Sequence, residues 1–144
     1  MDRERAAEFM GSLHRAQEEL YAGGDADGVR SLLSPEIVWQ VPGQSAIAGR
    51  YEGIEEVIGY MRRRRDLAGR TFRMHRRELL VGEGEHIAAL TDGTAVIGGR
   101  KLEWSTIGLY RLRDRLLLAC RLIPFDQAQF DSIWSGAPEA RSDD

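Results

Sequence analysis

Two side chains of this sequence, Asp126 and Tyr51, are our candidates for catalytic proton transfer. Carboxylic acids and phenols can both act as general acids or bases. Asp126 follows a predicted strand and precedes a short predicted helix, and its spacing to Gln129 resembles a capping box. Tyr51 lies in a predicted loop over residues 43–52. For Asp126 we favour a helix-capping role over a catalytic role, and both roles stay open.

Four further side chains, Gln17, Tyr21, Trp39 and Trp104, are candidates for binding a substrate. Gln17 interrupts the apolar stripe of a predicted helix between Leu13 and Tyr21. A buried amide needs hydrogen-bond partners, so Gln17 either bonds to the protein or faces a pocket. Trp39 and Trp104 lie on strand faces that we expect to point inward. They therefore belong either to an ordinary core, the favoured interpretation, or to the wall of an apolar ligand site.

No residues follow the spacing of a cofactor or metal site. His14, His75 and His86 share no metal-ligand spacing, and no cysteine joins them. The glycine pairs at 82–84 and 98–99 lack the strand–loop–helix context of phosphate loops and indicate hairpin turns. We therefore expect neither a metal ion nor an organic cofactor.

The four arginines at 62–65 form the most basic run in the chain. They end a predicted helix, where cations interact favourably with the helix dipole. No aromatic residue is interleaved with them, as nucleic-acid sites require. The run therefore predicts a solvated helix end and not a nucleic-acid site.

The elements that position these residues alternate helices and strands before four strands follow in succession. Helices are predicted over residues 2–22, 26–33 and 54–65, and strands over residues 37–41, 70–81, 85–97, 100–112 and 115–123. The last four strands are joined by two or three residues, so they must pair antiparallel. The fold class is therefore α+β, with three N-terminal helices packed on one face of a strongly curved antiparallel sheet.

Composition predicts a single soluble domain over residues 1–135 and a polar tail over residues 136–144. The 144 residues are 42% hydrophobic and 30% charged. The net charge of −3 favours neither nucleic acid nor an anionic membrane as partner. No apolar run is long enough for a membrane helix. The single cysteine, Cys120, predicts a buried structural thiol and a cytoplasmic location.

The last two predicted strands are apolar on both faces. Ile107 and Leu109 lie on the face opposite Trp104, and residues 116–119 leave neither face polar. An antiparallel sheet that is apolar on both sides is usually covered twice. The helices cover one side, and we expect a second copy of the chain to cover Ile107, Leu109 and Leu117 on the other. The sequence thus predicts a homodimer.

Several short motifs resemble the cone-shaped nuclear transport factor 2-like superfamily. They are YAGGDADG (21–28), VWQVPG (38–43), GRYEG (49–53), PFDQ (124–127) and DSIWS (131–135). This superfamily includes ketosteroid isomerases, limonene epoxide hydrolases and SnoaL-like polyketide cyclases, and the chain is similar to its SnoaL-like branch over residues 5–135. The resemblance implies a cone-shaped single domain with an internal hydrophobic pocket.

The residues that carry catalysis in two better-known branches are replaced in this chain. Where ketosteroid isomerases hold a tyrosine, an aspartate base and a protonated aspartic acid, the matching positions hold Gln17, Val41 and Gly108 or a neighbour of Gly108. The segments that match the limonene epoxide hydrolase carboxylates, residues 89–91 and 121–122, contain no acidic residue. The resemblance therefore implies neither activity.

What the resemblance does imply is a small-molecule enzyme similar to SnoaL-like cyclases and isomerases. It would apply cofactor-independent acid–base chemistry to a hydrophobic, oxygenated substrate. Gln17 would hydrogen-bond a substrate oxygen, Trp39 and Trp104 would wall the pocket, and Tyr51 or Asp126 would move a proton. The alternative is a non-catalytic ligand-binding or dimerisation module of the same fold, because this fold carries many activities.

Overall fold

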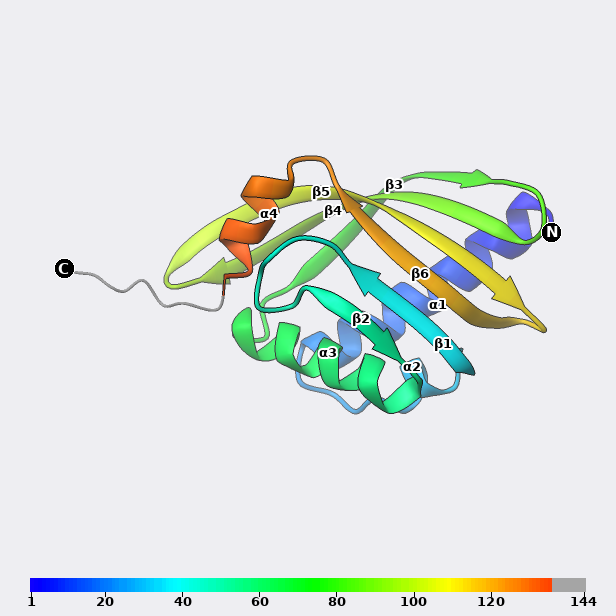
Figure 1. Cartoon of the computed structure of the whole chain (residues 1–144), viewed down its shortest axis with the longest axis horizontal. Helices are drawn as coiled ribbons and strands as arrows, with labels where there is room; N and C mark the ends of the chain where they lie inside the picture. The colour runs from blue at the N-terminus through cyan, green and yellow to red at the C-terminus, as the bar shows by residue number, and fades with distance from the viewer. Residues whose placement is uncertain (136–144) are drawn as a thin grey trace.

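The computed structural model describes residues 1–135, and the predicted tail at 136–144 lies outside the described residues. Helices and strands follow one another in an α+β order (Figure 1). Their bounds are α1 (Arg3–Tyr21), α2 (Asp27–Arg30), β1 (Leu33–Val41), β2 (Gly49–Glu52), α3 (Ile54–Leu67), β3 (Arg73–Val81), β4 (His86–Ile97), β5 (Arg100–Arg113), β6 (Leu116–Pro124) and α4 (Gln127–Ile133). Among these helices, none combines the length and the apolar character that crossing a membrane requires.

The described strands form one mixed sheet in the order β2-β1-β6-β5-β4-β3. The successive strands β3 to β6 pair antiparallel as predicted, but β1 runs parallel to β6. The expectation of a purely antiparallel sheet is therefore wrong. Short turns fix the direction of consecutive strands only, whereas β1 and β6 meet across most of the chain and their relative direction depends on the whole path between them.

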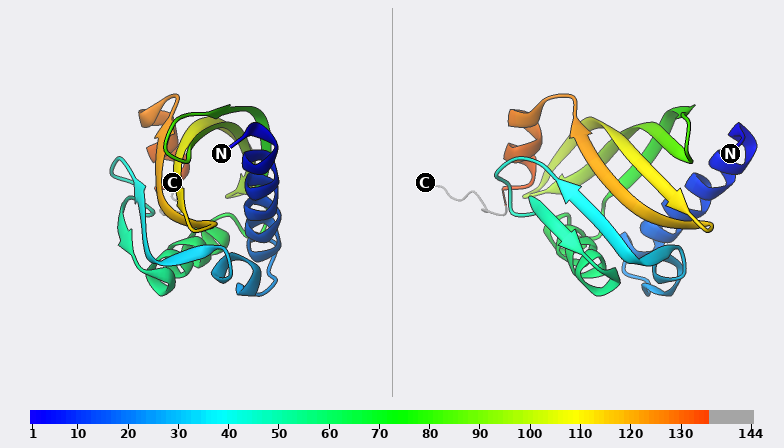
Figure 2. Two further views of the ribbon diagram at one scale, coloured as in Figure 1. Left: turned by 90° about the vertical axis from the view of Figure 1, so that its right-hand side faces the viewer. Right: turned by 45° about the vertical axis from the view of Figure 1, so that its right-hand side comes forward.

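The three predicted helices correspond to α1, α2 and α3, but β1 and β2 separate α2 from α3, so they do not form one N-terminal group. The short helix predicted after Asp126 is α4. Figure 2 shows the sheet curled into an open arch, with α1 along one side of its concave face. α1 packs on β3, and α3 packs on β1, β2 and α1. The curl is not closed, since β2 and β3 remain edge strands. The concave face and the two long helices enclose the core.

Four predicted segments change in the structure. The helix expected over residues 26–33 shrinks to α2, and β1 begins early, at Leu33. Pro35 is tolerated there because the β1–β6 register shifts between Leu33 and Val38, leaving that stretch outside the regular ladder. The loop expected over residues 43–52 contains β2, which pairs with β1. β3 begins only at Arg73.

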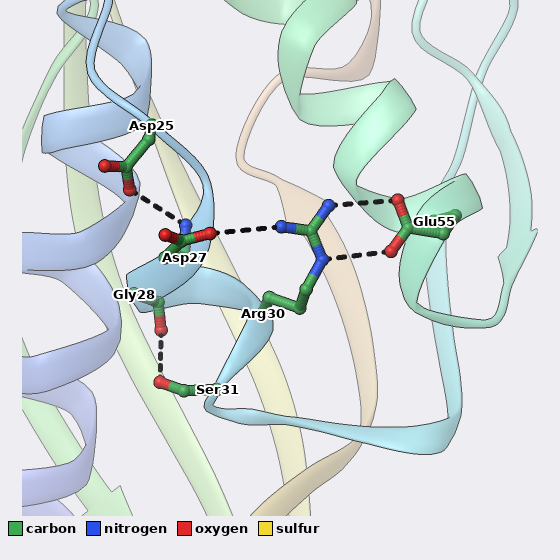
Figure 3. Close-up of polar contacts among 6 residues, drawn as sticks. All are labelled: Asp25, Asp27, Gly28, Arg30, Ser31 and Glu55. Atoms are coloured by element: carbon green, nitrogen blue, oxygen red, sulfur yellow. Dashed lines mark hydrogen bonds and ion pairs between the residues drawn. The ribbon is translucent and has the colours of Figure 1, made fainter.

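A surface ion pair links α2 to the first turn of α3 (Figure 3). Arg30 donates to both carboxylate oxygens of Glu55 at 3.0 Å and contacts Asp27 at 3.4 Å. Asp25 accepts a hydrogen bond from the Asp27 backbone N–H at 3.0 Å, just before α2. Because these groups are exposed, the pair orients α3 more than it stabilises the fold.

Two glycines on the concave face make room for aromatic rings. A Cβ atom at Gly93 would lie 2.5 Å from the indole of Trp104, its cross-strand partner. A Cβ atom at Gly108 would lie 2.5 Å from the hydroxyl of Tyr110. Each ring lies against its glycine, with the Tyr110 hydroxyl over Gly108 and the Trp104 indole over Gly93.

The convex face of the sheet carries exposed apolar side chains. Leu80 is 62% exposed, and Leu109 and Ile123 are exposed as well. Leu117 was expected on this face but is fully buried. The β5–β6 register shifts between Arg111 and Leu112, so the alternation of faces is broken there and Leu117 pairs with the buried Leu112.

Candidate functional site

Aromatic and polar side chains from both long helices, the sheet and α4 meet under the concave face. All are buried, and we call them the interior cluster: Gln17, Tyr21, Trp39, Tyr60, Arg64, Phe72, Trp104, Tyr110, Phe130 and Trp134. The rings contact one another with centroids 4.6–6.5 Å apart. The four predicted binding residues, Gln17, Tyr21, Trp39 and Trp104, thus come together in one place.

Arg64 is the charged centre of the interior cluster and only 4% exposed. Its Nη1 donates a 2.9 Å hydrogen bond to the Tyr60 hydroxyl. Its guanidinium carbon lies 4.4 Å from the Phe72 ring centroid and 4.5 Å from that of Trp134. Within residues 1–135 no carboxylate lies within ion-pair distance of this guanidinium. Buried arginines are rare unless paired, so Arg64 is an unusual core residue.

The prediction that the whole run at 62–65 forms a solvated helix end is therefore wrong for Arg64. A signal for this was present in the sequence. Arg64 follows Val57 by seven residues and Met61 by three, so it continues the apolar stripe of α3. The prediction followed the charge of the arginine and not its place in the apolar stripe. In the structure, the position on the helix determines that Arg64 is buried.

Tyr21 and Gln17 lie beside Arg64 on successive turns of α1. The Tyr21 hydroxyl and Gln17 Oε1 are both buried and have no hydrogen-bond partner among the described residues. Burial raises the pKa of Tyr21, and the nearby Arg64 and Gln17 offset this only in part. Gln17 lies close enough to favour the phenolate of Tyr21 without forming a full hydrogen bond. Tyr21 therefore stays protonated and is a hydrogen-bond donor, not a base.

Two buried indoles add further unused donors. Neither Trp39 Nε1 nor Trp134 Nε1 has a hydrogen-bond partner in the part of the chain that the structure describes. The Trp39 indole lies near the Tyr60 hydroxyl and lowers its pKa slightly, but burial dominates and raises it. Buried polar groups without partners are rare in folded proteins. Several of them gathered around one buried cation make the interior cluster the candidate site of this chain.

Tyr51, a predicted catalytic residue, lies at the edge of the interior cluster. Its ring stacks on Tyr60 with centroids 4.8 Å apart. Its hydroxyl donates to the backbone oxygen of Ile47 at 2.7 Å. Partial burial raises its pKa. The structure thus brings Tyr51 near the other candidates, with its proton directed at the backbone, and its catalytic role stays a prediction.

Asp126, the other predicted catalytic residue, is exposed and caps α4. Its Oδ1 accepts a 3.0 Å hydrogen bond from the backbone N–H of Gln129. The capping interpretation is confirmed. α4 in turn carries Phe130 and Trp134 into the interior cluster, so Asp126 supports the site from outside.

We expect Asp126→Asn to leave the free energy of unfolding nearly unchanged, because asparagine caps a helix about as well as aspartate. Asp126→Ala should lower it by about 0.5–2 kcal/mol. Urea denaturation of the three proteins measures both values. If a turnover found by screening disappears in Asp126→Asn while stability is kept, the carboxylate acts in catalysis and is more than a cap.

Other potential chemistry receives little support from the structure. Within the described residues, no group of histidine, cysteine, aspartate or glutamate side chains could hold a metal ion. Cys120 is free and buried as predicted, and burial raises the pKa of its thiol well above the usual range. A thiol in that state is a poor nucleophile.

A hollow of about 410 Å³ lies on the convex side, over β3 to β6 and the end of β1. Residues that line it include Leu80, Ala88, Leu109 and Arg121, which are neighbours across successive strands. Gln17, Tyr21, Trp39 and Trp104 do not line it. This hollow therefore adjoins the interior cluster at Tyr110 but does not include the four predicted binding residues.

Comparison with known proteins identifies the family of this chain. The SnoaL-like domain matches residues 14–119. This chain belongs to the SnoaL-like domain family. No curated protein matches its sequence. The SnoaL-like fold is shared with solved structures, among them NTF2-like proteins from Burkholderia species.

Three solved structures illustrate how closely this SnoaL-like fold is kept. Bal32a, from a soil-derived mobile gene cassette, is 22% identical over 90% of this chain and 98% of its own, with a TM-score of 0.79. TerC, co-crystallised with polyporic acid, is 16% identical over 90% and 97%, with a TM-score of 0.75. A protein from Jannaschia sp. CCS1, assigned to the SnoaL-like polyketide cyclases, is 17% identical over 96% and 99%, with a TM-score of 0.73. At these identities the likeness extends to the fold alone.

Within the SnoaL-like fold, the three positions compared earlier with ketosteroid isomerases are occupied without acid–base groups. Val41 is buried in the core. The space over Gly108 is filled by the Tyr110 ring. Gln17 faces the interior beside Tyr21. Any acid–base chemistry of this SnoaL-like domain would therefore need other residues. Arg64 is the buried charged residue that the sequence analysis missed.

Proposed function

We propose that this SnoaL-like domain is a small-molecule enzyme of the cyclase or isomerase type, which acts on a hydrophobic, oxygenated substrate without a cofactor. The observation that carries this proposal is the interior cluster, in which unused hydrogen-bond donors are enclosed by aromatic rings. Rings favour an apolar substrate body, and a few placed donors fix a substrate oxygen. The co-crystallisation of TerC, a protein of similar fold, with polyporic acid fits this class of ligand.

The chemistry would consist of stabilising negative charge on a substrate oxygen. Loss of a C–H proton next to a carbonyl places charge on the carbonyl oxygen, and preorganised donors in a dry site stabilise that charge. Tyr21 and Gln17 would hold the oxygen, while Trp39 and Trp104 would wall the apolar part. Tyr51 is the nearest candidate for moving the proton, because it stacks on Tyr60 at the edge of the cluster.

A non-catalytic ligand-binding module is the second candidate, and one observation favours it. The buried polar side chains of residues 1–135 are Gln17, Ser34, Arg64, Thr91 and Thr106, and none is a carboxylate. A site without a buried carboxylate has no obvious strong base, so it could hold a ligand without converting it.

A ligand screen separates these proposals. We expect hydrophobic compounds with carbonyl or phenolic oxygens to raise the unfolding temperature, since a ligand that binds only the folded state stabilises it. Tyr21→Phe should reduce the shift without unfolding the protein, because the lost hydroxyl has no partner. If chromatography shows that the protein converts a compound that binds, the enzyme proposal is supported. If the compound binds without being converted, the proposal of a ligand-binding module is supported. No shift with any such compound would contradict both.

We also propose that the SnoaL-like domain forms a homodimer through the convex face of its sheet, where Leu80, Leu109 and Ile123 are exposed. Light scattering at micromolar concentration should then give twice the chain mass of 16.2 kDa. Leu109→Glu should give a monomer, because a charge would be buried in the interface. Lys101→Glu, on the same strand near its end, should remain dimeric. A monomeric wild-type protein would contradict the proposal.

A cytoplasmic location completes the proposal. It is supported by the one cysteine of the sequence, Cys120, which is buried and free. Proteins without disulfides fit a reducing compartment.

A further inference from the structure

The positive charge of Arg64 is not balanced by a carboxylate among residues 1–135. Its nearest partners in the described chain are the neutral Tyr60 hydroxyl and the faces of Phe72, Trp134 and Phe130. Aromatic faces attract a cation, but less than a carboxylate does. The Nε–H of the same guanidinium is buried and has no hydrogen-bond partner. Arg64 therefore keeps unused capacity to bind an anion.

The polar atoms around Arg64 are mostly donors. The buried groups without partners include the Tyr21 hydroxyl, both indole N–H groups of Trp39 and Trp134, and Arg64 Nε. Gln17 Oε1 and the Thr91 hydroxyl oxygen are the acceptors among them. An interior rich in donors and poor in acceptors matches a ligand that brings acceptor atoms. A neutral ether or a hydrocarbon would leave most of these donors unused.

We propose that the ligand of the interior cluster is an anion, namely an apolar molecule that carries a carboxylate or another planar oxyanion and pairs with Arg64. This inference rests on the proposed function, because it names the chemical class of the same ligand. A carboxylate can accept two parallel hydrogen bonds from a guanidinium. Tyr21 would donate to it from α1, and the aromatic rings would hold the apolar part.

Access to Arg64 requires a ring to move. Phe72, Phe130 and Trp134 now lie against the guanidinium, and all three are buried. Trp134 follows α4, a helix of seven residues, whereas Phe72 lies between α3 and β3 in the body of the fold. The ligand would therefore take the place of the Trp134 ring over Arg64, and the indole N–H would become free to face it.

Isothermal titration with a matched pair of probes tests the inference. We expect 2-naphthoate to bind the wild-type protein roughly tenfold more tightly, or better, than the neutral 2-naphthamide, since hydrogen bonds to charged groups are the stronger ones. Arg64→Met should abolish this preference, because both probes would then meet an apolar site. Arg62→Met removes a charge from the exposed side of the same helix and should keep the preference.

Arg64→Met is expected to fold, because no carboxylate of residues 1–135 forms an ion pair with Arg64. If it fails to fold, Tyr21→Phe supplies the test and should weaken naphthoate binding more than naphthamide binding. Equal binding of both probes to the wild type would overturn the anion inference and leave the proposed function standing. A naphthoate preference that survives Arg64→Met would also overturn the inference. If Arg64→Met does not fold, an unchanged preference in Tyr21→Phe would overturn it. Binding of neither probe at millimolar concentration would overturn the proposed function as well.

Discussion

Trp104→Ala is expected to lower the free energy of unfolding by about 3–5 kcal/mol, the usual cost of removing a buried large aromatic side chain. Trp104 is 5% exposed and packs against Phe72 and Trp134 with centroid distances of 5.5 and 5.2 Å. Its ring also lies over Gly93. Urea denaturation with tryptophan fluorescence measures the change. A loss below about 1 kcal/mol would mean that the ring borders open space and that its packing contributes little.

Gly93 provides a sharper test of the same contact. Gly93→Ala should lower the free energy of unfolding by about 1–3 kcal/mol, because its methyl group would overlap the Trp104 ring. In the Trp104→Ala background the same change should cost far less, and the difference is the coupling energy of the pair. Gly59→Ala, on the exposed side of α3 with no atom within 4 Å, is the control and should be neutral or slightly stabilising. Equal costs of Gly93→Ala in both backgrounds would contradict the packing.

Mild acid is expected to destabilise the protein through His14. Burial, and to a smaller extent the charge of Arg76, lowers the pKa of His14 from 6.5 to about 4. Above pH 6.5 the imidazole is neutral in the folded and unfolded states, so it has no effect. Between pH 6.5 and about 4 only the unfolded state takes up the proton, so the free energy of unfolding decreases as the pH is lowered. The total loss is about 3 kcal/mol from this one group.

His14→Gln removes the titrating group and should flatten the pH dependence of the free energy of unfolding over this interval. His86→Gln, at an exposed position, is the matched control. The pKa values of the Asp92 and Glu55 carboxylates are lowered by their hydrogen-bond partners. Their contribution to the free energy of unfolding is therefore lost at more acidic pH. A wild-type protein of constant stability from pH 6.5 to 4.5 would show that His14 is accessible to protons in the folded state.

Much of the candidate site was predictable from local sequence. Helix periodicity placed Gln17 and Tyr21 on the inward face of the first helix, and strand alternation placed Trp39 and Trp104 inward. Short connections fixed the antiparallel pairing of β3 to β6. These features depend on residues close together in the chain, and backbone geometry links such residues directly.

The properties that matter most for function arise from contacts between distant segments. β1 pairs parallel with β6 some eighty residues later. Arg64 meets Tyr60 on its own helix, Phe72 before β3, and Phe130 and Trp134 from the end of the described chain. The sequence alone determined that position 64 lies on the apolar side of a helix. Only the tertiary structure decided that aromatic rings and no carboxylate of the described chain would surround the charge, because the environment of a buried group is set by the elements that close around it.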